Sequence, residues 1–414
     1  MKKILVRGPA LTRSGYGEHT RFLIRSLRKY EDTFYIFLIN TTWGQTGWIF
    51  EESQEREWID KTLQKTILYN QNNGVYDMSL QVTIPNEWEK LAPINIGVTA
   101  GIETTAVSPA WLEKSKLMDK IITISNHSKF VFERSRYDGV VRQTQEKFVL
   151  KCETPIDVVH YPVRIYEPSN LDLELDTDFN FLSVAQWSPR KNVENAIKWF
   201  VEEFIDQEVG LVLKLFKINN SIIDRVQTEK TLKQILAQYP QRKCKIYMLH
   251  GDMSDEEMTA LYQHPKIKAL ISMAHGEGFG LPIFEAVYNG IPILAPDWSG
   301  QVDFLHMPVT KNGKTKKKPH FARIDYDIGP VQKEVVWDGV IQEESMWCYP
   351  KQGSYKMRLR EVYKEYGRFN KQAKILKKWA LKEFSEEKQY DKFVNSYLGV
   401  FPNMVDEKEI QVYG

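Results

Sequence analysis

The most constraining feature of the sequence is a strand-like segment, a glycine-rich loop and a helix-like segment that follow one another within residues 267–295. Residues 267–273 are short and mostly apolar, which predicts a buried strand. Pro282 suits the first turn of a helix, and the apolar residues after it provide one buried face. Gly290 ends that helix, and residues 291–295 predict the next strand. This order predicts a parallel sheet whose carboxyl edge carries the loop, and open α/β sheets bind ligands at that edge.

The loop itself combines glycines with carboxylates. Gly278 and Gly280 let backbone N–H groups approach a ligand closely, and the start of the helix adds positive partial charge suited to a phosphate. Glu277 lies in the loop, and Glu285 lies about two helical turns further on. Two carboxylates around an anion site suit a ligand with hydroxyls at both ends and phosphate between them, as in a nucleotide-sugar. The alternative is a tight turn with a glutamate that interacts with the helix dipole and a second, satisfied glutamate on the surface.

The segment Glu277-Gly-Phe-Gly-Leu-Pro-Ile-Phe-Glu285 resembles the E-x7-E signature of the retaining GT-B glycosyltransferases of family 4. The likeness continues through residues 286–294, which are similar to the family's EA-x-x-x-G-x-P-V continuation. The resemblance implies that Glu277 contacts hydroxyls of the donor sugar and that Glu285 binds the nucleotide ribose. It also implies that the loop faces the phosphates or the sugar through Gly278, Phe279 and Gly280.

A second loop carries the cations that such a ligand needs. Residues 179–185 predict a strand, and the polar segment after it contains Gln186, Arg190 and Lys191. This junction resembles the family's G-R-x-x-x-x-K element, whose arginine and lysine hold the diphosphate of the sugar donor. Lys191 matches the lysine, whereas Gln186 occupies the arginine position, and Arg190 is the candidate substitute. Cations at a helix start oppose the helix dipole, which favours an anionic ligand over a solvated pair.

The amino-terminal part of the chain offers weaker candidates. A strand over residues 4–6 and a helix over residues 19–30 flank a loop with Gly15 and Gly17. The resemblance implies that this loop borders the cleft and helps to hold the donor sugar or the acceptor. A simple turn is the alternative. Trp43 follows the strand predicted over residues 34–39 and either stacks on a sugar or base or closes a core.

Two further candidates come from the segment between residues 99 and 128. Glu103 stands in a loop similar to a W-E-T loop of many GT-B enzymes, and the resemblance implies an acceptor-side carboxylate facing the cleft. His127 follows the predicted helix cap Ser125 and is the other polar candidate, the alternative being a solvent-exposed side chain.

Length, composition and net charge limit the possible classes of protein. A chain of 414 residues with 42% hydrophobic and 27% charged residues is typical of a globular protein with two domains. A net charge of +2 does not indicate nucleic-acid binding by itself. The three cysteines lack ligand spacing, so we expect no metal site and a reducing compartment. No apolar run approaches the length of a membrane span or a signal peptide, and we expect a cytoplasmic location.

These observations lead to one prediction of fold and function. We expect two Rossmann-like domains that face each other across a cleft, over residues 1–165 and 178–377, with a carboxyl-terminal helix from about 378 to 414 that crosses back to the first domain. The resemblance implies a metal-independent retaining glycosyltransferase, hexosyl or pentosyl, that needs no cofactor besides its nucleotide-diphosphate-sugar substrate. The catalytic candidates are Glu277, Glu103 and Lys191.

Several alternatives stay open from the sequence. The arginine position occupied by Gln186 leaves room for a catalytically silent nucleotide-sugar-binding protein, and the fold also accommodates a nucleotide-sugar epimerase or a phosphorylase. The acceptor is a saccharide, a lipid-linked glycan, a protein or a hydroxylated DNA base. The lysine-rich segment over residues 311–318 is either a solvated loop or a basic flap for an anionic acceptor.

Overall fold

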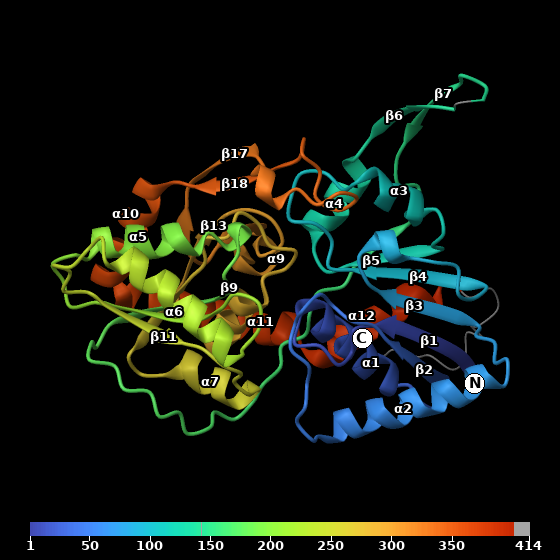
Figure 1. The fold of residues 1–414 in the computed structure, drawn as a ribbon, viewed down its shortest axis with the longest axis horizontal. Helices are drawn as coiled ribbons and strands as arrows, with labels where there is room; N and C mark the ends of the chain where they lie inside the picture. The colour runs from blue at the N-terminus through green and yellow to red at the C-terminus, as the bar shows by residue number, and fades with distance from the viewer. Residues whose placement is uncertain (142, 401–414) are drawn as a thin grey trace.

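The computed structural model describes residues 1–141 and 143–400, and this part of the chain forms two halves that lie side by side (Figure 1). The amino-terminal half is built on a six-stranded sheet in which all neighbours are parallel. Its strands, in spatial order, are β2 (Phe34–Asn40), β1 (Lys2–Gly8), β3 (Met78–Val82), β4 (Ile94–Thr99), β5 (Lys120–Thr123) and β8 (Ile156–Val158).

The carboxyl-terminal half is built on a second parallel sheet of six strands. Its spatial order is β11 (Lys245–Leu249), β10 (Gly210–Phe216), β9 (Asn180–Gln186), β12 (Ile267–Ile271), β13 (Ile293–Pro296) and β16 (Ala322–Ile324). The chain adds strands outward from β9 on one side and then returns to add β12 on the other side. The carboxyl ends of β9 and β12 therefore form a topological switch point, where ligands bind in open α/β sheets. Two Rossmann-like domains were predicted, and the structure confirms this fold class.

Helices cover both sheets. Those of the amino-terminal half are α1 (Gly15–Arg28), α2 (Gln54–Gln71), η1 (Pro85–Glu87), α3 (Pro109–Ser115) and α4 (Asn126–Arg134). Those of the carboxyl-terminal half are η2 (Pro189–Lys191), α5 (Val193–Glu203), α6 (Ile222–Leu236), α7 (Asp255–Gln263), α8 (Leu281–Asn289), α9 (Val302–Leu305), η3 (Lys333–Val335) and α10 (Gln352–Lys364). Because helices cover the faces of each sheet, the strands are buried on both sides. Their sequences are accordingly nearly continuous apolar runs.

The end of the described chain returns to the first half. Helix α11 (Tyr366–Glu383) packs against α8, and α12 (Glu386–Leu398) packs against α1. The ring of Phe393 meets that of Phe22 edge-on, with centroids 5.2 Å apart. The predicted crossing is confirmed for the described residues, which form two helices instead of one, and residues 401–414 of the predicted helix lie outside the described residues. Ser385 caps α12 by accepting a hydrogen bond from the Lys388 N–H, which gives the helix a new start.

Among the described residues, three antiparallel hairpins extend from this framework. The pair β6 (Tyr137–Val140) and β7 (Lys147–Leu150) projects from the amino-terminal half, and β17 (Tyr326–Pro330) pairs with β18 (Met346–Pro350). The lysine-rich segment is the third hairpin, β14 (His306–Lys311) with β15 (Lys314–Pro319). Within the described residues, no helix has the length and apolar character needed to cross a membrane.

We expect the contact between α12 and α1 to contribute strongly to stability. Phe393 is fully buried, so Phe393→Ala should lower the free energy of unfolding by about 3–5 kcal/mol through lost burial and a residual cavity. Chemical denaturation measures this change. Ile375→Ala on the exposed face of α11 is the control and should cost less than about 1 kcal/mol. Equal effects of the two substitutions would contradict the packing of α12 on the first half.

Candidate functional site

Two loops meet at the switch point of the second sheet. The first leaves β9 at Gln186 and passes through η2, which carries Arg190 and Lys191. The second leaves β12 and carries Glu277 to the start of α8, where Gly280 adopts a left-handed conformation with φ of +96°. A glycine fits this conformation without strain, and Pro282 fits the first turn of the helix. The local sequence thus places a carboxylate and two cations around one helix start.

Glu277 is the centre of a buried ion cluster. Its Oε2 lies 3.0 Å from Nη1 of Arg190, and its Oε1 lies 2.5 Å from Nζ of Lys191. Burial by itself would raise the pKa of Glu277, but the charges of Lys191 and Arg190 outweigh burial and hold that pKa below its usual value. The Glu277 N–H donates to Oγ of Ser299, which fixes the loop from the other side. The carboxylate is therefore ionised and held in one orientation.

Glu103 joins this cluster from the amino-terminal half. Its Oε1 lies 3.3 Å from Nη1 of Arg190, and the same guanidinium nitrogen donates to the Gly276 carbonyl at 2.8 Å. The guanidinium thus connects carboxylates from both halves of the chain. The structure brings together the three residues predicted as catalytic, although they are separated by up to 174 positions in the sequence.

The glycines of the loop allow the two halves to touch. A Cβ on Gly276 would lie 2.5 Å from the Glu103 carbonyl oxygen, and a Cβ on Gly278 would lie 2.6 Å from the Ala100 carbonyl oxygen. Both distances are too short for any other residue at these positions. We predicted that small residues here give a ligand access to backbone N–H groups. In this structure the backbone of residues 100–103 occupies that space.

Glu285 lies on α8, is only partly buried, and forms no ion pair with a described residue. Its Oε2 accepts a hydrogen bond of 2.7 Å from the Tyr262 hydroxyl. Burial raises the pKa of Glu285 to about 7, with further contributions from the negative charges of Asp255 and Glu18, against the lowering effect of the hydrogen bond from Tyr262. This carboxyl group therefore changes its charge near neutral pH, unlike Glu277.

Other predicted donor-binding residues lie around this cluster in different ways. Gln186 is exposed, and its amide donates to the Lys217 carbonyl at 2.9 Å. The Phe279 side chain is buried against Tyr161 and Phe304, so only its backbone is placed to face a ligand. Arg190, the candidate substitute for the family's arginine, does contact the glycine-rich loop, through the Gly276 carbonyl.

The first glycine loop borders the contact between the halves. Gly15 begins α1, and its carbonyl accepts from the Tyr161 hydroxyl at 3.0 Å. The Gly17 N–H donates to Oγ of the cap residue Ser14. A Cβ on Gly17 would lie 2.1 Å from the Thr12 carbonyl oxygen, so this position requires glycine for the turn itself.

The two acceptor-side candidates make packing contacts. The Trp43 ring lies on Tyr16 with centroids 4.2 Å apart. His127 lies 3.2 Å from the Thr104 carbonyl through Nε2, and its ring meets Trp298 of the second half edge-on. Burial lowers the pKa of His127 to about 4, so its imidazole is neutral at pH 7.

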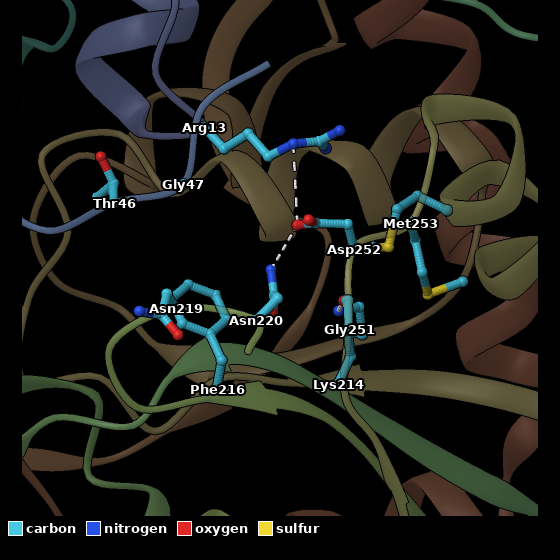
Figure 2. A pocket seen from close by; sticks show the side chains of 11 residues that line it. Arg13, Thr46, Gly47, Lys214, Phe216, Asn219, Asn220, Gly251, Asp252 and Met253 are labelled. Carbon is cyan, nitrogen blue, oxygen red and sulfur yellow. Dashed lines mark hydrogen bonds and ion pairs between the residues drawn. The ribbon is translucent and has the colours of Figure 1, made fainter. Parts of the chain in front are cut away.

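A cavity of about 180 Å³ lies between the halves near the carboxyl ends of β10 and β11 (Figure 2). The first half contributes Arg13 and Gly47, and the second contributes Lys214 and Asp252 among others. The sequence analysis did not identify this cavity. The available signal was Lys214, a single charged residue inside the apolar run of β10. Among the described residues, no group of three or more His, Cys, Asp or Glu side chains is placed to hold a metal ion.

Comparisons with known proteins bear on this site. Residues 172–316, which contain both loops of the switch point, match the family model described as Glycosyl transferases group 1. Over 118 residues, or 28% of this chain, the sequence is 30% identical to the serotype-specific mannosyltransferase WbdA of Escherichia coli. The aligned segment spans 13% of that relative's length. The residues that match the family model thus lie in the second half of the chain.

Solved structures extend the likeness of fold to nearly the whole chain. Anabaena HepE in complex with UDP and glucose aligns with 97% of this chain and 100% of its own, with a TM-score of 0.58 and 13% identity. Sucrose-phosphate synthase from Thermosynechococcus elongatus aligns with 97% of this chain and 99% of its own, with a TM-score of 0.62 and 12% identity. At these identities the likeness shows the fold, which is GT-B.

The raised pKa of Glu285 predicts a specific dependence of stability on pH. Because the folded-state value of about 7 lies above the ordinary 4.5, the contribution of this carboxyl is full below pH 4.5 and is lost as the pH rises through 7. Glu285→Gln removes the titration. The free energy of unfolding of the variant, relative to the original protein, should therefore increase between pH 5 and pH 8 by at most about 3 kcal/mol. Parallel pH profiles in chemical denaturation would contradict the raised pKa.

Proposed function

We propose that this protein transfers a sugar from a nucleoside-diphosphate-sugar to an acceptor hydroxyl, with retention of the anomeric configuration. The observation that carries the proposal is the buried cluster of Arg190, Glu277 and Lys191 at the switch point, inside the segment that matches the glycosyltransferase family. A buried carboxylate with two cations beside a helix start is suited to an anionic ligand that also bears hydroxyls.

The two cations would serve the diphosphate. Lys191 and Arg190 both neutralise Glu277 in this structure, and a diphosphate placed beside them would take over part of their hydrogen bonding. Charge would then develop on the leaving diphosphate next to fixed positive groups, which stabilises the transition state. Because these side chains supply positive charge at the leaving group, we propose that transfer proceeds without a metal ion and without a further cofactor.

Glu277 would serve the sugar. Once the diphosphate engages the cations, the carboxylate is free to accept hydrogen bonds from sugar hydroxyls and to stabilise positive charge at the sugar ring. Glu103 approaches from the other half and would face the incoming acceptor. Glu285, held by Tyr262, would bind the ribose of the nucleotide.

The contact between the halves has to open for the sugar donor to enter. The backbone of residues 100–103 lies against Gly276 and Gly278, and the resemblance places phosphate or sugar at Gly278. We infer that the halves separate to admit the sugar donor and close on it, since neither glycine has room for a ligand and for this backbone together.

The matched relative suggests the class of sugar. WbdA is a mannosyltransferase, and the sequence likeness to it extends over 118 residues of this chain. We therefore propose a hexose as the transferred group.

Replacing Glu277 with glutamine separates the two roles of the cluster. Turnover of the sugar donor should fall about 100-fold or more, because the group that stabilises charge at the sugar ring is lost. Affinity for the free nucleoside diphosphate should stay the same or increase, since a neutral glutamine does not compete with the diphosphate for the charges of Lys191 and Arg190. Steady-state kinetics and calorimetry measure the two quantities. An equal loss of both would show that Glu277 only maintains the structure.

Lys191 and Gln186 offer a matched comparison of phosphate binding. Lys191→Gln should raise the Kd for a nucleoside diphosphate about 10- to 100-fold, as expected for a lost charge-assisted hydrogen bond. Gln186→Ala should change the Kd less than about threefold, because its amide is exposed and bonded to the Lys217 carbonyl. Titration calorimetry on both variants tests this assignment. A larger effect of the Gln186 substitution would place the phosphates elsewhere.

A further inference from the structure

The cavity between the halves contains a buried lysine with hydrogen-bonding capacity to spare. Lys214 is 8% exposed, and its ammonium donates to the Gly251 carbonyl at 2.5 Å. Among residues 1–141 and 143–400, no carboxylate forms an ion pair with it, and burial lowers its pKa. An ammonium group carries three N–H donors, so a buried one calls for further acceptors. The floor of the cavity therefore suits a ligand with acceptor atoms.

The rim of the same cavity offers acceptors instead. The Asn220 amide nitrogen donates to Oδ1 of Asp252 at 2.6 Å, which fixes the orientation of the amide. Oδ1 of Asn220 is buried and has no hydrogen-bond partner in the described structure. Arg13 of the first half also lies near Asp252, with its Nε 3.8 Å from Oδ1 of Asp252 (Figure 2). A carboxylate and an unpartnered amide oxygen together suit a ligand with two neighbouring donors.

Three apolar side chains also line the cavity, beside the polar residues Thr46 and Asn219. Phe216 contributes a ring on one side, and Met253 and Met258 contribute thioethers. Aromatic and thioether groups around a few polar atoms are typical of sites that hold a flat heterocycle. The cavity volume of about 180 Å³ belongs to a small ligand fragment and not to a whole nucleotide-sugar.

The cavity also adjoins the proposed ribose site. Met258 lines the cavity, and Tyr262, the partner of Glu285, lies four residues later on the same helix α7. Residues four apart lie on one face of a helix. A nucleoside whose ribose reached Glu285 would therefore extend its base along this face toward the cavity.

We propose that this cavity binds the base of the sugar donor and selects guanine, an inference that rests on the proposed function. Guanine has two acceptors, O6 and N7, on one edge, and these match the ammonium of Lys214. It also has two neighbouring donors: the 2-amino group matches the carboxylate of Asp252, and N1–H matches the free oxygen of Asn220. Uracil has a single N–H between two carbonyls, and adenine has no N–H beside its amino group. Neither base complements both the floor and the rim.

Titration calorimetry with GDP, UDP and ADP tests this inference on the full-length protein. GDP should bind at least about ten times more tightly than UDP or ADP, in line with the free energy by which a bidentate contact discriminates between bases. Asp252→Asn should lower the affinity for GDP by at least about tenfold. The same variant should gain affinity for xanthosine diphosphate, because xanthine carries a carbonyl in place of the 2-amino group and accepts from the new amide.

Asp206→Asn is the matched control, since Asp206 is an exposed aspartate of the same half that does not line the cavity. It should leave all affinities unchanged. UDP or ADP binding as tightly as GDP, or GDP binding unaffected by Asp252→Asn, would overturn the guanine assignment and leave the proposed transferase standing. Failure of every nucleoside diphosphate to bind would overturn both.

Discussion

The site depends on the burial of the Glu277 carboxylate between two cations. A carboxylate that is only 7% exposed is stable in its charged form because Arg190 and Lys191 lie within hydrogen-bonding distance. Removing one partner from such a cluster leaves an uncompensated buried charge, which is strongly unfavourable. A ligand that brings its own negative charge can exchange with Glu277 for the cations without that cost. The cluster is thus stable in the ligand-free protein and also adapted to an anionic substrate.

The same cluster joins the two halves of the chain, and other contacts reinforce it. The Thr105 N–H donates to the Met346 carbonyl at 2.9 Å, and the Asn126 N–H donates to Oδ2 of Asp303 at 2.7 Å. The apolar core also continues across the boundary, where Phe279 packs on Tyr161. The structure therefore represents a closed arrangement, in which Glu103 and Glu277 meet on one arginine. Binding energy from the sugar donor would have to replace these contacts during each cycle.

Sequence reasoning predicted the fold from local patterns, and the resemblance to a glycosyltransferase family named the residues that meet in the buried cluster. Apolar runs followed by glycine loops and amphipathic helices predict parallel strands, and the loops after β9 and β12 meet for topological reasons. The same reasoning does not give side-chain direction. Phe279 stands within the signature, yet its ring fills the core, because a motif specifies spacing and not orientation. The cavity was missed for a related reason, since Arg13 and Lys214 come together only through the packing of the two halves. The break before α12 has a local signal, the cap residue Ser385, which the sequence analysis did not use.

The measurement that tests the central claim most directly is NMR of purified protein incubated with a panel of nucleoside-diphosphate hexoses. We expect one sugar donor to be cleaved slowly by water, with the released sugar appearing first in the anomeric configuration that it had in the sugar donor. Release in the opposite configuration would contradict retention while leaving sugar transfer intact. Absence of binding and cleavage for every member of the panel would contradict the assignment of Arg190, Lys191 and Glu277 to a nucleotide-sugar.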